Sequence, residues 1–187
     1  MPSKVVLDAC VLYPLPLRDT LLRVAEQELY IVRWSERILD EVARNLIEHP
    51  RATPQQARAL IGAMQRAFGG ASVPEPAIAA LEPTMTNAHE DRHVLAAAVA
   101  SGAQAIVTSN LRDFPKAACQ PFGIEILHPD QFLCDLHGCN AARVHAALRD
   151  QVAALSRPPM NVRELLELLE KSTPQFAKRI RDDLPSD

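Results

Sequence analysis

The chain has 187 residues, of which 48% are hydrophobic and 23% are charged, a composition typical of a folded globular protein. These proportions exclude a disordered chain, a collagen-like chain and a small disulfide-stabilised scaffold. The formal net charge of −3 excludes a strongly basic protein that coats nucleic acid, but not a nucleic-acid enzyme with an acidic metal site. Apolar runs fall short of the roughly 18 residues of a membrane span, so we expect no membrane segment. Four cysteines favour a reducing, cytoplasmic setting over a disulfide framework.

The first part of the chain alternates short apolar runs with amphipathic segments. The β-branched run at residues 4–7 ends at Asp8 and predicts a buried parallel strand. The pattern then predicts a helix over residues 15–29, a strand over 30–33, a helix capped by Ser35, and a helix from Thr53-Pro54 to Gly69-Gly70. Residues 72–83 contain several prolines and predict a loop with one short helix.

The alternation continues to about residue 128, after which the expected elements are all helical. We predict a helix over residues 89–101 that is closed by Gly102, and strands over 104–108 and 124–127. Beyond Pro129 we predict a helix over 140–155, a break at Pro158-Pro159, a helix after the Asn161–Glu164 capping box, and a last helix from Thr173-Pro174. Strands joined by helical crossovers predict a three-layer α/β fold with a parallel sheet. We therefore expect a main domain at residues 1–137 and a C-terminal helical extension at residues 138–187.

Four carboxylates are expected at one edge of this sheet. Asp8 ends the first strand, and Asp113 follows the strand over residues 104–108. Asp91 begins the helix that leads into that strand, and Glu41 lies one turn into its own helix. Ligands of parallel α/β sheets bind outside the carboxyl ends of the strands, so this edge is the expected position of a site.

Carboxylates held together repel one another unless a cation neutralises them. Oxygen ligands favour Mg²⁺ or Mn²⁺ over Zn²⁺, and such ions bind phosphates and lower the pKa of a water molecule. The alternative is that each of these acids is a helix cap or a solvated surface charge.

Several segments resemble the PIN-domain ribonucleases. The run Val5-Val6-Leu7-Asp8 with the following Ala9-Cys10-Val11-Leu12 is similar to the opening of that family, and Leu39-Asp40-Glu41-Val42 is similar to the helix that supplies its glutamate. The longest similarity, from Asp91 to Ala98 and from Ala105 to Pro115, resembles the VapC-type toxin branch. The resemblance covers about residues 4–135.

The resemblance implies a Mg²⁺-dependent endoribonuclease, the toxin of a type II toxin–antitoxin pair, which cleaves RNA phosphodiester bonds with a metal-activated water. Its partners would be the RNA substrate and a cognate antitoxin, and a homodimer is left open. The catalytic and metal-binding residues that it implies are the same four acids, namely Asp8, Glu41, Asp91 and Asp113.

The residues implied as substrate contacts are Thr108, Asn110 and Arg112. The chain departs from the family pattern directly after Asp8, because Ala9-Cys10 stand where many members have a hydroxyl or amide side chain. This departure weakens the expected support of Asp8.

The sequence leaves two alternative functions open. The first is a PIN fold without catalysis that acts as an RNA-binding or interaction module. The second is a zinc metalloprotease, since His89-Glu90-Asp91-Arg92-His93 matches the pattern H-E-x-x-H. That pattern needs the middle of a helix, whereas here it falls at a predicted helix start.

A separate zinc site is a further alternative. Its candidate ligands are Cys134, His137 and Cys139, with Cys119 or His128 as a fourth. This spacing fits no common zinc finger, so we expect these residues to be ordinary parts of the fold.

Overall fold

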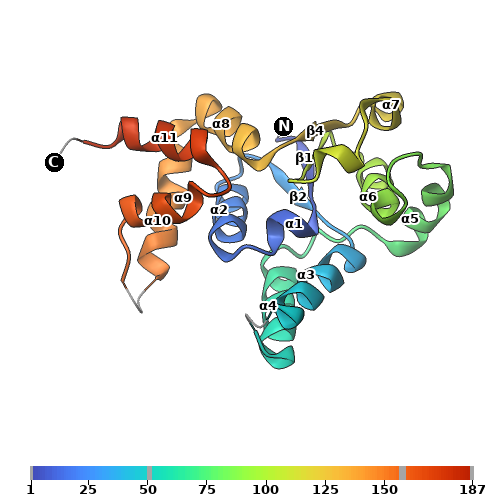
Figure 1. Cartoon of the computed structure of the whole chain (residues 1–187), viewed down its shortest axis with the longest axis horizontal. Coiled ribbons are helices and arrows are strands. Elements are labelled where there is room, and N and C mark those ends of the chain that lie inside the picture. The colour runs from blue at the N-terminus through green and yellow to red at the C-terminus, as the bar shows by residue number, and fades with distance from the viewer. Residues whose placement is uncertain (1, 50–51, 156–158, 186–187) are drawn as a thin grey trace. The chain divides into compact units, whose positions relative to one another are not determined.

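A computed structural model of the chain describes residues 2–49, 52–155 and 159–185 (Figure 1). These residues form two compact units. The first consists of Ser3–Tyr13 and Ile31–Leu127, and the second of Pro14–Tyr30 and the described residues from His128 onward.

The first unit is built on a four-stranded parallel sheet with the strand order β2-β1-β3-β4. The strands are β1 (Lys4–Leu7), β2 (Ile31–Arg33), β3 (Ala105–Val107) and β4 (Glu125–Leu127), in agreement with the sequence prediction to within two residues. Val5 in the centre of the sheet pairs with Val32 on one side and Ala105 on the other. This order brings the carboxyl ends of β1 and β3 next to each other, which decides where the candidate site lies.

Both faces of the sheet are covered. Val5, Val6 and Leu7 follow one another in β1 and are 1%, 0% and 0% exposed, although successive strand residues point to opposite faces. The helix α6 (Arg92–Ser101) packs against β1 and β3. A buried parallel sheet between helices confirms the predicted three-layer α/β class.

The helices of the first unit follow the predicted capping signals. Ser35 accepts a hydrogen bond from the Ile38 backbone N–H and begins α3, and Thr53 forms a full capping box with Gln56 at the start of α4. Gly102 ends α6 with a φ of 63°, a conformation that glycine adopts without strain. Besides α6, the α-helices of this unit are α1 (Ala9–Leu12), α3 (Glu36–Glu48), α4 (Pro54–Ala67), α5 (Glu75–Leu81) and α7 (Lys116–Cys119).

Short 3₁₀ turns interrupt the predicted pattern. They are η1 (Glu82–Thr84), η2 (His89–Asp91), η3 (Leu111–Asp113) and η4 (Gln120–Phe122). The helix predicted over residues 89–101 therefore begins later, at Arg92, because the Asp91 N–H donates to the Ala88 carbonyl three residues earlier at 3.0 Å. This turn places Asp91 directly at the N-terminus of α6.

The second unit is entirely helical in its described residues. It contains α2 (Leu15–Glu26), α8 (Pro129–Cys139), α9 (Ala141–Ala154), α10 (Val162–Leu169) and α11 (Pro174–Asp183). The predicted break at Pro158-Pro159 begins at a residue that lies outside the described ones. No helix of the described residues is long and apolar enough to cross a membrane.

The boundaries of this unit differ from the sequence prediction. We expected the division after residue 137, whereas the structure divides the chain after Leu127 and adds α2 to the helical unit. The reason is a set of distant contacts: the buried Thr20 hydroxyl of α2 donates to Gln151 of α9 at 2.7 Å, and the Gln151 amide donates to the Pro16 carbonyl at 3.1 Å. The aromatic rings of Tyr30 and of Phe132 in α8 also meet edge to face.

Candidate active site

Asp8 lies at the carboxyl end of β1 and is 3% exposed. Its carboxylate accepts hydrogen bonds from the Ala9 backbone N–H at 2.6 Å and from the Thr108 hydroxyl at 2.6 Å. The first bond caps α1, and the second joins the end of β1 to the end of β3. Hydrogen bonds to the ionised form stabilise a buried carboxylate, so Asp8 is fixed in one position.

Thr108 is fully buried, and its hydroxyl also accepts the Asn110 N–H at 3.0 Å. The Thr108 hydroxyl therefore bonds to Asp8 and to the Asn110 backbone within the protein. The sequence instead predicts that Thr108 contacts the substrate. Asn110 and Arg112, the other two predicted substrate contacts, are exposed beside and within η3.

Cys10 occupies the place where the sequence departs from the family pattern. Its thiol donates to the second oxygen of Asp8 at 3.1 Å and accepts the Ser109 N–H at 3.2 Å. Burial, and after it the neighbouring Asp8 carboxylate, raises the pKa of Cys10 to about 12. The thiol therefore stays protonated and supports Asp8 as a donor, so the weaker support expected from the sequence is partly restored.

Asp8 is approached by Asp91 at the end of η2 and by Asp113 at the end of η3. The Ala88 N–H donates to the Asp113 carbonyl at 3.0 Å and ties these two segments together. Burial raises the pKa of Asp91 to about 6, with further contributions from the charges of Asp8, Asp113 and Glu41, while His93 acts in the opposite direction. The structure thus brings all four predicted acids within electrostatic range of one another.

Glu41 is joined to this group through His93. The Glu41 carboxylate lies 3.0 Å from Nε2 of His93, which is 4% exposed in the first turn of α6. This contact holds α3 against the N-terminus of α6, two residues beyond Asp91.

A hollow of about 570 Å³ opens between α3 and the start of α6. Its lining residues are Arg37, Asp40, Glu41, Arg44, Asn45, Glu90, Asp91 and His93. The basic and amide residues of α3 in this lining were not among the predicted site residues. They lie four residues before and three and four residues after Glu41, so the helical spacing could have identified them.

The two arginines in this hollow have different surroundings. Arg37 makes a two-bond contact with Glu82 at 2.6 and 3.1 Å and a further ion pair with Glu75 at 3.0 Å. Arg44 is exposed and stands one helical turn from Glu41. Its guanidinium is therefore the better placed of the two to meet a phosphate.

The geometry does not favour the zinc-protease pattern. His89 is exposed in η2, whereas His93 is buried in α6, so the two imidazoles do not share the face of one continuous helix. His93 instead contacts Glu41 through Nε2.

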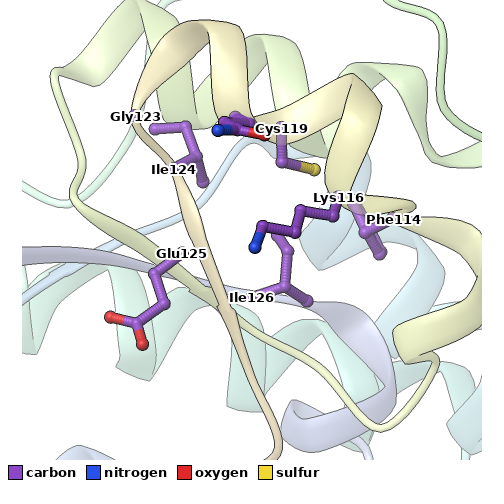
Figure 2. Close-up of a pocket in the computed structure, with 8 residues that line it drawn as sticks. Phe114, Lys116, Cys119, Gly123, Ile124, Glu125 and Ile126 are labelled. Carbon is purple, nitrogen blue, oxygen red and sulfur yellow. The ribbon is translucent and has the colours of Figure 1, made fainter.

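A second hollow of about 430 Å³ lies beside α7 and β4 in the same unit. Figure 2 shows that Phe114, Cys119, Ile124 and Ile126 contribute to its lining, together with Lys116. None of the predicted site residues lines it. The carboxylates make the first hollow the better candidate for chemistry.

Comparisons with known proteins divide the chain near residue 128, as the structure does, but place α2 with the first part. A family model described as the PIN domain matches residues 4–112, and a model described as the VapC50 C-terminal domain matches residues 129–182. A curated protein of Mycobacterium tuberculosis (strain ATCC 25618 / H37Rv), named "Putative ribonuclease VapC50", is 43% identical over 102 residues, which is 54% of this chain. The matched part spans 60% of that relative's length. No solved structure matches.

Proposed function

Because the chain belongs to the PIN domain family, we propose that it is a metal-dependent endoribonuclease and the toxin of a VapC-type toxin–antitoxin pair. The observation that carries this proposal is the junction of four chain segments at one edge of the sheet. Two hydrogen bonds, of Thr108 with Asp8 and of Ala88 with Asp113, and the close contact of His93 with Glu41 form this junction.

The residues at this edge fit a hard divalent cation. The candidate donors are all carboxylate oxygens, which Mg²⁺ and Mn²⁺ prefer. The charges of Asp8, Asp113 and Glu41 add to the effect of burial in raising the pKa of Asp91, so these acids act on one another electrostatically. Asp8, Asp91 and Asp113 would hold the ion, and Glu41 would hold a second one or orient the attacking water. A bound Mg²⁺ supplies positive charge at the scissile phosphate and lowers the pKa of that water.

The remaining residues position these acids. Thr108, Cys10 and the Ala9 N–H fix the Asp8 carboxylate, and His93 fixes Glu41. Arg44 and the exposed Asn110 and Arg112 are available to bind the phosphates of RNA by charge and hydrogen bonding. On the same assignment we expect a cytoplasmic protein whose cognate antitoxin covers the acidic edge.

The test is cleavage of purified cellular RNA by the full chain. We expect cleavage with millimolar Mg²⁺ and none in EDTA, and sequencing of the new RNA ends will identify the target. Asp91→Asn should abolish cleavage, whereas His89→Ala should retain most of it. Asp150→Asn, which alters an exposed carboxylate of α9, is the matched control.

Two results would contradict the proposal. A wild-type protein that binds RNA but does not cleave it would indicate a PIN fold that serves as a binding module. Zinc-dependent peptide hydrolysis that is lost in His89→Ala would indicate the protease.

A further inference from the structure

The helical unit contains a cluster of metal-ligating side chains far from the four acids in sequence. His137 of α8 and His145 of α9 both contact one carboxylate oxygen, Oδ2 of Asp183 in α11, through their Nε2 atoms, at 2.8 and 3.0 Å. The two imidazole rings meet edge to face, with their centroids 5.6 Å apart. We propose that His137, His145 and Asp183 form a binding site for a divalent transition-metal ion, with Zn²⁺ as the expected ion.

The distances suit such an ion. The three potential ligand atoms lie within 4.8 Å of one another. Ligands about 2.1 Å from a tetrahedral Zn²⁺ are roughly 3.4 Å apart, so the contacts of 2.8 and 3.0 Å to Asp183 need to lengthen by about half an ångström. Two imidazoles and one carboxylate are a common zinc ligand set, and a water would complete it.

Charge at the end of α11 also favours a cation. Asp183 is the last residue of this helix, where the partial negative charge of the helix terminus disfavours a carboxylate. A divalent ion bound between the two imidazoles and Asp183 would place positive charge at this end of the helix.

The site would complete the attachment of α11. At the start of this helix, the buried Asp130 of α8 accepts the Phe176 N–H at 2.8 Å and the Gln175 N–H at 3.2 Å. The metal site would fix the other end of α11 to α8 and α9. Its role is therefore structural, holding three helices of this unit together.

The sequence analysis found only one of these ligands. It grouped His137 with Cys134 and Cys139, which are near it in sequence, whereas the structure groups it with residues from two other helices. Cys134 is buried, and burial raises its thiol pKa, which disfavours the thiolate that zinc requires.

The test uses the full chain carrying Asp91→Asn, so that metal binding at the acidic edge is weakened in every sample. We expect Co²⁺ to give the visible absorption of a four-coordinate site, without the sulfur charge-transfer band of cysteine ligation. Zn²⁺ at about 100 times its Kd should raise the unfolding midpoint by on the order of 5 °C. Adding His145→Gln, or separately Asp183→Asn, should weaken Zn²⁺ binding at least tenfold.

Both substitutions preserve polar side chains at the surface, so their folding can be verified by circular dichroism. His49→Gln, at the exposed end of α3, is the control and should bind Zn²⁺ like the parent. Equal Zn²⁺ affinity in the parent, His145→Gln and Asp183→Asn would overturn the proposal, as would a parent that binds neither ion. These results would leave the ribonuclease proposal unaffected, because the acids of that site are in the other unit.

Discussion

Thr108 is one of the residues that fix the position of Asp8. Its hydroxyl donates to one oxygen of a carboxylate that is almost completely buried. Thr108→Val keeps the shape and removes this donor, so we expect a loss of about 1–3 kcal/mol of unfolding free energy and weaker Mg²⁺ binding. Denaturant unfolding with and without Mg²⁺ measures both effects.

Thr86→Val is the control for this substitution, because Thr86 is exposed. Equal unfolding free energies and equal Mg²⁺ responses in the two variants would show that Thr108 does not support Asp8.

The raised pKa of Asp91 predicts a particular pH dependence in EDTA. The ordinary value of 3.8 is raised to about 6 in the folded protein, so between these values the native state binds the proton more tightly than the unfolded chain. This contribution to stability is complete below about pH 4 and is lost as the pH rises through 6. Asp91→Asn removes it, and the variant should be more stable than the wild type above pH 6, by about 1 kcal/mol after allowance for solvent screening.

The measurement is the difference in unfolding free energy between the two proteins from pH 4 to pH 8. The difference should grow across this range in EDTA, and Mg²⁺ should reverse its sign by stabilising the wild type alone. A difference that does not change with pH would show that the folded protein does not raise the pKa of Asp91.

The helices α3 and α6 meet through one polar contact at the site, between Glu41 and His93. His93→Leu places an apolar side chain of similar size in the buried position and releases Glu41. We expect RNA cleavage to fall about ten- to a hundredfold through kcat, with a smaller change in KM, because a catalytic group is misplaced rather than removed. His89→Leu, at an exposed position, should cleave normally; if both variants lose activity equally, His93 is not a positioning residue.

Elements with strong end signals could be predicted from the sequence, whereas the shortest ones could not. Ser35, Thr53 and Gly102 mark the ends of α3, α4 and α6 where the structure has them. Helices α1 and α7 have four residues each, too few for a helical repeat to be visible. Helix α8 was missed although Pro129 occupies its first turn, a usual start signal.

The candidate site was predictable to the extent that it follows from strand ends. Asp8 and Asp113 could be placed because parallel strands share a carboxyl edge. The contact between His93 and Glu41 depends on packing between segments distant in sequence, which periodicity does not reveal. The Cys10 thiol is only two residues from Asp8, but its position also depends on contacts with the distant Thr108 and Ser109.

At the scale of the whole molecule, the acids and the C-terminal helices belong to different units. Deletion of residues 158–187 removes α10 and α11, which pack on α2, α8 and α9. We expect the shortened protein to aggregate more readily because it exposes those apolar faces. It should still unfold cooperatively and be stabilised by Mg²⁺, since all four acids remain in the first unit.

Thermal unfolding of the shortened chain, with EDTA and with millimolar Mg²⁺, tests this expectation. Loss of any cooperative transition would show that the first unit cannot fold without α10 and α11.

If the four carboxylates form one metal centre, a titration with Mn²⁺ will show it. The full chain carrying His145→Gln is titrated by calorimetry, so that the acidic edge is the site measured. We predict saturable Mn²⁺ binding that is unchanged by adding Asp150→Asn and weakened at least tenfold by adding Asp8→Asn or Asp91→Asn. Equal Mn²⁺ affinity in all four proteins would show that neither Asp8 nor Asp91 binds the ion.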